Sequence, residues 1–154
     1  MKKLPLIFIF AGLSLLSLTG CEKHRLDAEV RELCAMDGGI KVYETAELPE
    51  SEFNQFGQVS FYQASTGSIL LAEYELIKNE RIYRSGNPRM WRTSFAIKRK
   101  SDGKIIGESV GYTRFGDGFE GPFHPTSFSC PEQFGETSLL KLIFVNKKST
   151  SRGN

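Results

Sequence analysis

The sequence predicts an α+β domain with one N-terminal helix packed on a mainly antiparallel β-sheet of about five to seven strands. Three observations predict this fold. An amphipathic helical pattern lies near the N-terminus, runs of alternating apolar and polar residues follow it, and an Asp-Gly turn joins the two clearest runs. The chain has 154 residues, the length of a single domain, and contains no internal repeat.

The helix is predicted from the spacing of its apolar residues. Leu26, Val30, Leu33 and Cys34 recur at i, i+4, i+7 and i+8, which is one face of a helix. The helix is expected to end at residues 37–39, Asp-Gly-Gly, because glycine is favoured just after a helix C-terminus. This places Cys34 on the buried face of the last turn.

A β-hairpin is the clearest element of the remainder. Residues 90–100 alternate between apolar and polar side chains, residues 101–103 read Ser-Asp-Gly, and residues 104–115 return with a second apolar pattern. Shorter strands are predicted at 40–43, 58–63 and 69–77, with 81–84 pairing back onto 69–77 across 79–80. A loop or short helical turn (48–57), a long glycine-rich loop (116–135), a final strand (139–145) and a polar tail (147–154) complete the prediction.

The N-terminus has the pattern of an export signal. Lys2 and Lys3 precede an uncharged, apolar run over residues 4–18. At 15 residues the run is shorter than the roughly 20 that a transmembrane helix needs. An uncleaved signal anchor is the alternative.

Residues 18–21, Leu-Thr-Gly-Cys, resemble the lipobox of bacterial lipoproteins. The resemblance covers only the first 21 residues. It implies that residues 1–20 are removed and that Cys21 is acylated, which anchors the protein to the cell envelope. Glu22 stands where an Asp would retain an enterobacterial lipoprotein at the inner membrane, so the resemblance favours the outer membrane. Behind the anchor we expect a tether (21–25), one domain (26–146) and the tail.

The two other cysteines are expected to form a disulfide. Cys34 and Cys130 are the only pair available if Cys21 is acylated, and an exported chain folds in an oxidising compartment. Buried free thiols are the alternative. The charge is also uneven: residues 22–80 hold 12 acidic and 5 basic residues, and residues 81–154 hold 6 acidic and 13 basic. Such a division either steers a charged partner or lets the two halves neutralise each other.

Two motifs imitate catalytic or cofactor sites. Residues 107–111 match G-x-S-x-G around Ser109, and Asp117 and His124 follow in the order of a hydrolase triad. That motif needs a strand–turn–helix context, whereas here it lies within a predicted hairpin strand, so Gly107 and Gly111 are interpreted as a bulge or a close backbone approach. Residues 116–121 match G-x-G-x-x-G, but the prolines that follow oppose the helix that a dinucleotide site needs.

Two segments are candidates for binding. The first is a basic strand with interleaved aromatic residues, and the alternative is that it is a solvated sheet face. The second is the glycine-rich loop, whose rings could instead cap the sheet. The candidate residues are Arg89, Trp91, Arg92, Lys98 and Lys100 for the strand, and Phe119, Phe123 and His124 for the loop.

The sequence therefore predicts a non-enzymatic, lipid-anchored envelope module that binds a protein, lipid or glycan. Export makes a nucleic-acid partner unsuitable. His24 and His124 are the only histidines, so we expect neither a metal nor a cofactor. The alternative function is a small periplasmic hydrolase that uses Ser109, or the loop carboxylates Asp117 and Glu120.

Overall fold

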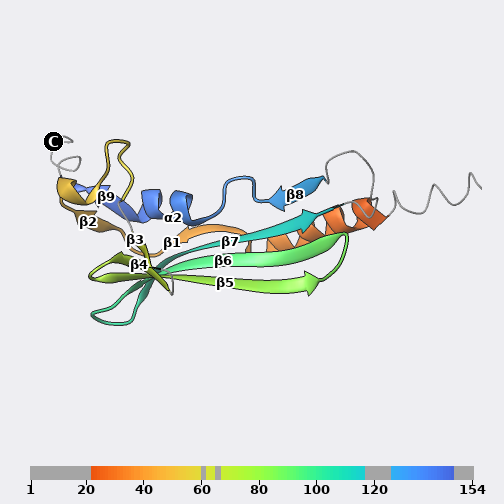
Figure 1. Ribbon diagram of the computed structural model, residues 1–154, viewed down its shortest axis with the longest axis horizontal. Coiled ribbons are helices and arrows are strands. Elements are labelled where there is room, and N and C mark those ends of the chain that lie inside the picture. The colour runs from red at the N-terminus through yellow and green to blue at the C-terminus, as the bar shows by residue number, and fades with distance from the viewer. Residues whose placement is uncertain (1–21, 60–61, 65–66, 117–125, 148–154) are drawn as a thin grey trace, which may run out of the picture.

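The N-terminal helix spans residues 22–37 and lies on one face of a seven-stranded sheet (Figure 1). The computed structural model describes residues 22–59, 62–64, 67–116 and 126–147. The predicted α+β class is confirmed. Residues 22–25, expected as a tether, belong to the helix, and Glu22 forms an ion pair with Arg84.

The strands follow the order β1-β7-β6-β5-β4-β3, with every pair antiparallel. Strand β8 also pairs with β7, so β1 and β8 share one edge: β1 pairs with residues 107–110 and β8 with residues 112–115. A second sheet consists of β2 and β9 in parallel. The elements are β1 (Gly39–Val42), β2 (Ala46–Leu48), the 3-10 helix η1 (Glu50–Glu52), β3 (Tyr62–Ala64), β4 (Gly67–Leu71), β5 (Tyr74–Arg84), β6 (Arg89–Arg99), β7 (Ile105–Phe115), β8 (Ser127–Cys130), α2 (Glu136–Ile143) and β9 (Phe144–Asn146).

The hairpin of β6 and β7 is confirmed, but the strands before it are divided differently. The predicted strand 69–77 is two strands, since β4 ends at Leu71 and β5 begins at Tyr74. Strand β5 continues straight through residues 79–80, and residues 81–84 pair with β6. The predicted turn at 79–80 is therefore wrong. The real turn, Ala72-Glu73, has neither the Gly nor the Asn or Asp that usually marks one.

Two predictions near the C-terminus are also wrong. Residues 139–145, expected as a strand, form most of α2 and the start of β9. Leu139, Leu140 and Ile143 are all buried, and only a helix puts these three positions on one face. The predicted loop 116–135 contains β8, which the neighbouring glycines and prolines concealed.

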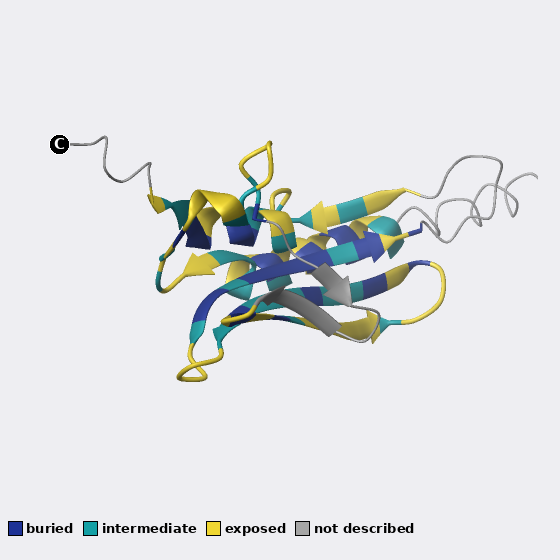
Figure 2. Ribbon diagram, turned by 60° about the vertical axis from the view of Figure 1, so that its left-hand side comes forward, coloured by how far each residue is buried: buried dark blue, intermediate teal, exposed yellow. Residues whose placement is uncertain are grey.

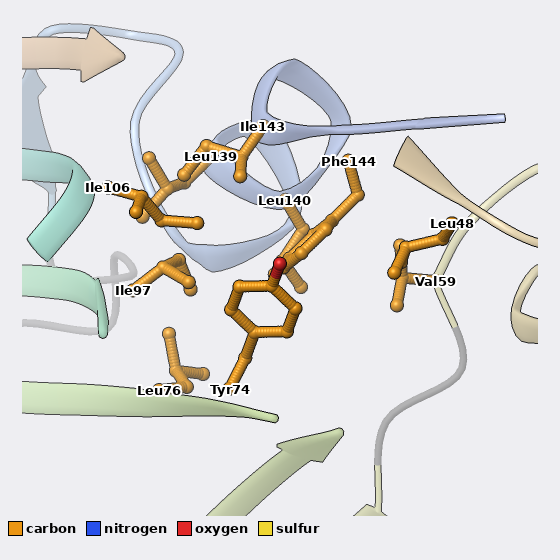
Figure 3. Packing of buried hydrophobic residues seen from close by; sticks show 10 residues of the cluster. All are labelled: Leu48, Val59, Tyr74, Leu76, Ile97, Ile106, Leu139, Leu140, Ile143 and Phe144. Carbon is orange, nitrogen blue, oxygen red and sulfur yellow. The ribbon is translucent and has the colours of Figure 1, made fainter. Parts of the chain in front are cut away.

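Apolar clusters lie on both faces of the sheet. On one face, the helix places Leu26, Val30 and Cys34 against Met90, Val110 and Tyr112. On the other face, α2 packs its three buried residues over the β5–β6–β7 strands, and Tyr74 meets Phe144 edge to face with ring centroids 5.0 Å apart (Figure 3). The strand between these layers, β7, is buried along most of its length, whereas β8 alternates between exposed and half-buried residues (Figure 2).

The helices within the described part of the chain are too short or too polar to cross a membrane.

Candidate functional site

One row of side chains crosses four strands on the face opposite the N-terminal helix. The backbone register aligns Ile82, Trp91, Thr113 and Ser129. Ile82 exposes 54% of its surface and Trp91 is half-buried. The hydroxyls of Thr113 and Ser129 lie 3.0 Å apart, which confirms that both project from this face.

The next row places a cation beside the tryptophan. Arg89 pairs in register with Phe115, the last residue of β7. The guanidinium carbon of Arg89 lies 5.1 Å from the centroid of the Trp91 ring, and Phe115 is 47% exposed. An arginine over a tryptophan is a favourable cation–π pair, and it leaves the donors of the guanidinium available to a ligand.

On this face, the segment formed by Phe134 and α2 covers the sheet only up to the row before these two. Phe134 lies over Gly111, where a Cβ would come within 2.3 Å of its ring, and α2 continues from there toward β9. In the two rows beyond, Ile82 and Phe115 are exposed, and Trp91 and Thr113 are half-buried. We call Ile82, Arg89, Trp91, Thr113 and Phe115 the open sheet face. It combines apolar, hydroxyl and cationic groups, a mixture typical of interface cores.

The five predicted residues of the basic strand do not form one surface. Strand alternation puts Arg89 and Trp91 on the open sheet face and Arg92 on the other, where it donates to Asp37 at 3.0 Å. Lys98 Nζ lies 4.0 Å from a carboxylate oxygen of Glu75. Lys100 Nζ donates to the carbonyl of Ala72 at 3.1 Å. Arg89 and Trp91 are the two of the five that face the same open surface.

Arg92 belongs to a polar group beneath the end of the helix. Asp37 also accepts from the Tyr112 hydroxyl at 2.6 Å. Burial raises the pKa of Asp37, but the hydrogen bonds from Tyr112 and Arg92 outweigh it, so the net pKa is lowered. Burial, and then the bond to Asp37, raise the pKa of Tyr112. These contacts fix the helix C-terminus on the sheet and assign Arg92 a structural role.

The residues of the G-x-S-x-G motif form the surface of β7 on which residues 134–143 pack. Its glycines and Ser109 alternate onto the same face of β7. A Cβ at Gly107 would come within 2.5 Å of Ile143, one at Gly111 would meet Phe134, and Ser109 Oγ accepts from Gly135 N at 2.8 Å. Ser109 is fully buried. Side chains of Ile143 and Phe134 thus pack closely on the two glycines, and the β6–β7 register shifts just after the Ile97–Gly107 pair, so a bulge of the expected kind begins at Gly107.

The predicted disulfide is present. The Sγ atoms of Cys34 and Cys130 lie 2.11 Å apart and join the end of the helix to the end of β8. The other predicted site residues, Cys21, Phe119, Phe123 and His124, lie outside the described residues, as do Asp117 and Glu120.

Far from the open sheet face there is a pocket of about 300 Å³. It lies where the β4–β5 turn meets β2, and its lining carries two carboxylates and one phenol. The lining residues are Leu48, Pro49, Glu52, Ala72, Glu73 and Tyr74. Within the described ranges, no three His, Cys, Asp or Glu side chains are grouped to hold a metal ion.

Sequence reasoning found Arg89 and Trp91 but missed Ile82, Thr113 and Phe115. The sequence does not give the register of β5 against β6. Ile82 lies opposite Trp91 only because β5 runs unbroken to Arg84. No protein-family model, curated protein or solved structure matches the chain.

Proposed function

We propose that the protein is a lipid-anchored cell-envelope module that binds a partner through its open sheet face and carries out no chemistry. The exposed Ile82 and Phe115 and the half-buried Trp91 beside Arg89 are the observation that carries this proposal. Contiguous exposed apolar side chains are uncommon on soluble domains and mark interaction surfaces. Tryptophan and arginine are also the residues most often found at the energetic centre of interfaces.

The lipobox resemblance supports the anchor. Its residues 18–21 precede Glu22, which starts the described helix, so an acylated Cys21 would hold the domain directly at the lipid surface. Two or more acyl chains make such attachment stable, because each buried methylene contributes about 0.8 kcal/mol.

A hydrolase built on Ser109 is the less favoured function. The Ser109 hydroxyl is buried beneath residues 134–135 and accepts a backbone hydrogen bond, so a substrate could reach it only if that segment moved. A fluorophosphonate that labels Ser109 in the folded protein would revive this alternative.

Two experiments test the proposal. In cells fed labelled palmitate, Cys21→Ser should abolish labelling while Cys34→Ser retains it; labelled Cys21→Ser protein would overturn the anchor. A photo-cross-linking residue at Ile82 should then capture an envelope component in living cells. The matched control carries the same residue at Leu142 on α2, which is 52% exposed. Equal capture from both positions, or none from Ile82, would overturn the binding role.

A further inference from the structure

The open sheet face lies at the end of the domain to which the anchor would be attached. Glu22 follows Cys21 directly in the sequence. Glu22 Oε1 lies 2.7 Å from Arg84 Nη2, at the last residue of β5. Ile82 is two residues earlier on the same strand and pairs with Trp91. The start of the N-terminal helix and the open sheet face therefore share one end of the long axis, while α2 and β9 lie toward the other (Figure 1).

Three of the described acidic residues at this end are paired, whereas Glu29 on the helix is exposed and forms no ion pair with another described residue. Glu22 is bound to Arg84, Asp27 to Arg114 and Glu80 to Lys78. Lys23 and Arg25 at the helix start and Arg81 on β5 add cations to this end, on the side of the sheet that the helix covers, since Arg81 pairs in register with Arg92.

The remaining cations give this end an outward positive charge. Arg81 lies over the ring of Tyr83, and Arg89 lies over the ring of Trp91. Neither these two arginines nor Lys23 and Arg25 form an ion pair with another described residue. A cationic surface with exposed aromatic rings complements an anionic membrane, because cations are drawn to lipid phosphates and tryptophan is enriched at the membrane–water interface.

We propose that the partner of the open sheet face is the anionic lipid surface beneath the anchored domain. This inference rests on the lipid anchor of the proposed function and names the ligand of the same site. The domain tilts so that Trp91, Ile82 and Phe115 enter the headgroup region while Arg89 reaches the phosphates. Apolar burial and electrostatic attraction together determine the strength of such interfacial contacts.

The short connection favours lipid over protein as the ligand. The helix begins at the first described residue after the acylation position, and the Glu22–Arg84 ion pair ties that residue to the sheet. The domain end is therefore held within reach of the headgroups. A protein partner would have to enter between this face and the bilayer.

Trp91 is the only tryptophan of the chain, so its fluorescence reports on this face alone. The full-length lipoprotein is reconstituted into phosphatidylcholine vesicles with or without phosphatidylglycerol, containing lipids brominated near the headgroup. We expect bromine to quench Trp91, more strongly with phosphatidylglycerol, and salt to weaken the effect. The control Trp91→Phe/Leu142→Trp moves the reporter to α2 and should show little quenching.

Arg89→Gln should keep the melting temperature but lose most of the phosphatidylglycerol dependence. Quenching no greater than that of the position-142 reporter, or no dependence on anionic lipid, would overturn the inference. If Ile82 then cross-links a protein, the binding module stands and only its lipid ligand falls. If Cys21→Ser is still labelled by palmitate, the anchor itself is wrong and the inference falls with it.

Discussion

Asp27 and Arg114 form an ion pair between the N-terminal helix and the end of β7. Asp27 Oδ1 accepts from Arg114 Nε at 2.5 Å, and the arginine side chain is only 1% exposed. Nη1 of Arg114 also donates to the carbonyl oxygens of Gly116 and Thr126. One guanidinium thus ties the helix, the end of β7 and the residue before β8 together, at the end that carries the open sheet face.

Asp27→Asn should be strongly destabilising. It leaves a buried positive charge without its counter-charge, a loss that typically costs about 3–5 kcal/mol. The free energy of unfolding in urea measures the effect. Glu29→Gln, an exposed acid on the same helix, is the matched control and should change stability by less than about 0.5 kcal/mol.

The double variant Asp27→Leu/Arg114→Met makes the test sharper. If the cost of Asp27→Asn comes from an uncompensated charge, removing both charges should recover much of the loss, since apolar replacements of buried pairs are often tolerated. A double variant that is less stable than Asp27→Asn would show that the hydrogen bonds to Gly116 and Thr126 matter more than the charge.

Gly111→Ala should dislodge Phe134. The added methyl would lie within 2.3 Å of the ring, and overpacking of this kind costs about 1–3 kcal/mol. In the Phe134→Ala background the ring is gone, so the same glycine substitution should cost much less. A double-mutant cycle measured by urea unfolding gives the coupling. Equal costs in both backgrounds would mean that Phe134 does not rest on Gly111.

Removing the disulfide should destabilise the domain substantially. Cys34 and Cys130 are 96 residues apart in sequence, and the chain-entropy model gives a loop of that length about 4–5 kcal/mol as an upper guide. Cys34→Ala/Cys130→Ala should lower the urea midpoint, and the reduced wild type should behave similarly. Maleimide labelling of Cys130 in the folded, unreduced protein would contradict the bond.

Local pattern was enough to predict the β6–β7 hairpin and the helix that covers one face of the sheet. The helix over Leu26, Val30 and Cys34 and the hairpin around Asp102-Gly103 have strong, unambiguous periodicity, and both formed as predicted. Residues 139–145 failed because a short apolar run fits a strand or a buried helix equally well. Burial of both Leu139 and Leu140, which decides between them, is a tertiary property.

The candidate site was half predictable for a related reason. Composition singled out the segment with Arg89 and Trp91, and alternation alone could have separated Arg92 onto the opposite face. Ile82 could not be assigned, because its place beside Trp91 depends on the register of β5 against β6. The G-x-S-x-G match misleads in the opposite way, because it looks catalytic and is structural. Its two glycines and its serine are spaced two residues apart because they lie on one face of β7, where the C-terminal segment packs on them.

A surface ion cluster clamps the β6–β7 turn. Arg99 binds both Glu44 and Asp102, with Nη2 at 2.7 Å from Asp102 Oδ2, and Lys104 Nζ lies 2.9 Å from Glu44 Oε2. Hydrogen bonds from Arg99, and then from Lys104, lower the pKa of Glu44 from 4.5 to about 2. Arg99, and then the Lys104 backbone N–H, lower the pKa of Asp102 from 3.8 to about 2.

These depressed pKa values predict acid sensitivity with a defined sign. A carboxylate whose pKa is lower in the folded state stabilises fully above its unfolded pKa and stops doing so as the pH falls through the folded value. The contribution of Glu44 should therefore decline between about pH 4.5 and about pH 2.

Glu44→Gln should lower the melting temperature modestly at about pH 6, because the group is exposed, and should flatten the decline in acid. Melting temperatures of both proteins across this range measure the difference, with Glu47→Gln, an exposed acid on β2, as the control. Parallel curves for wild type and Glu44→Gln would mean that Glu44 contributes nothing to acid unfolding.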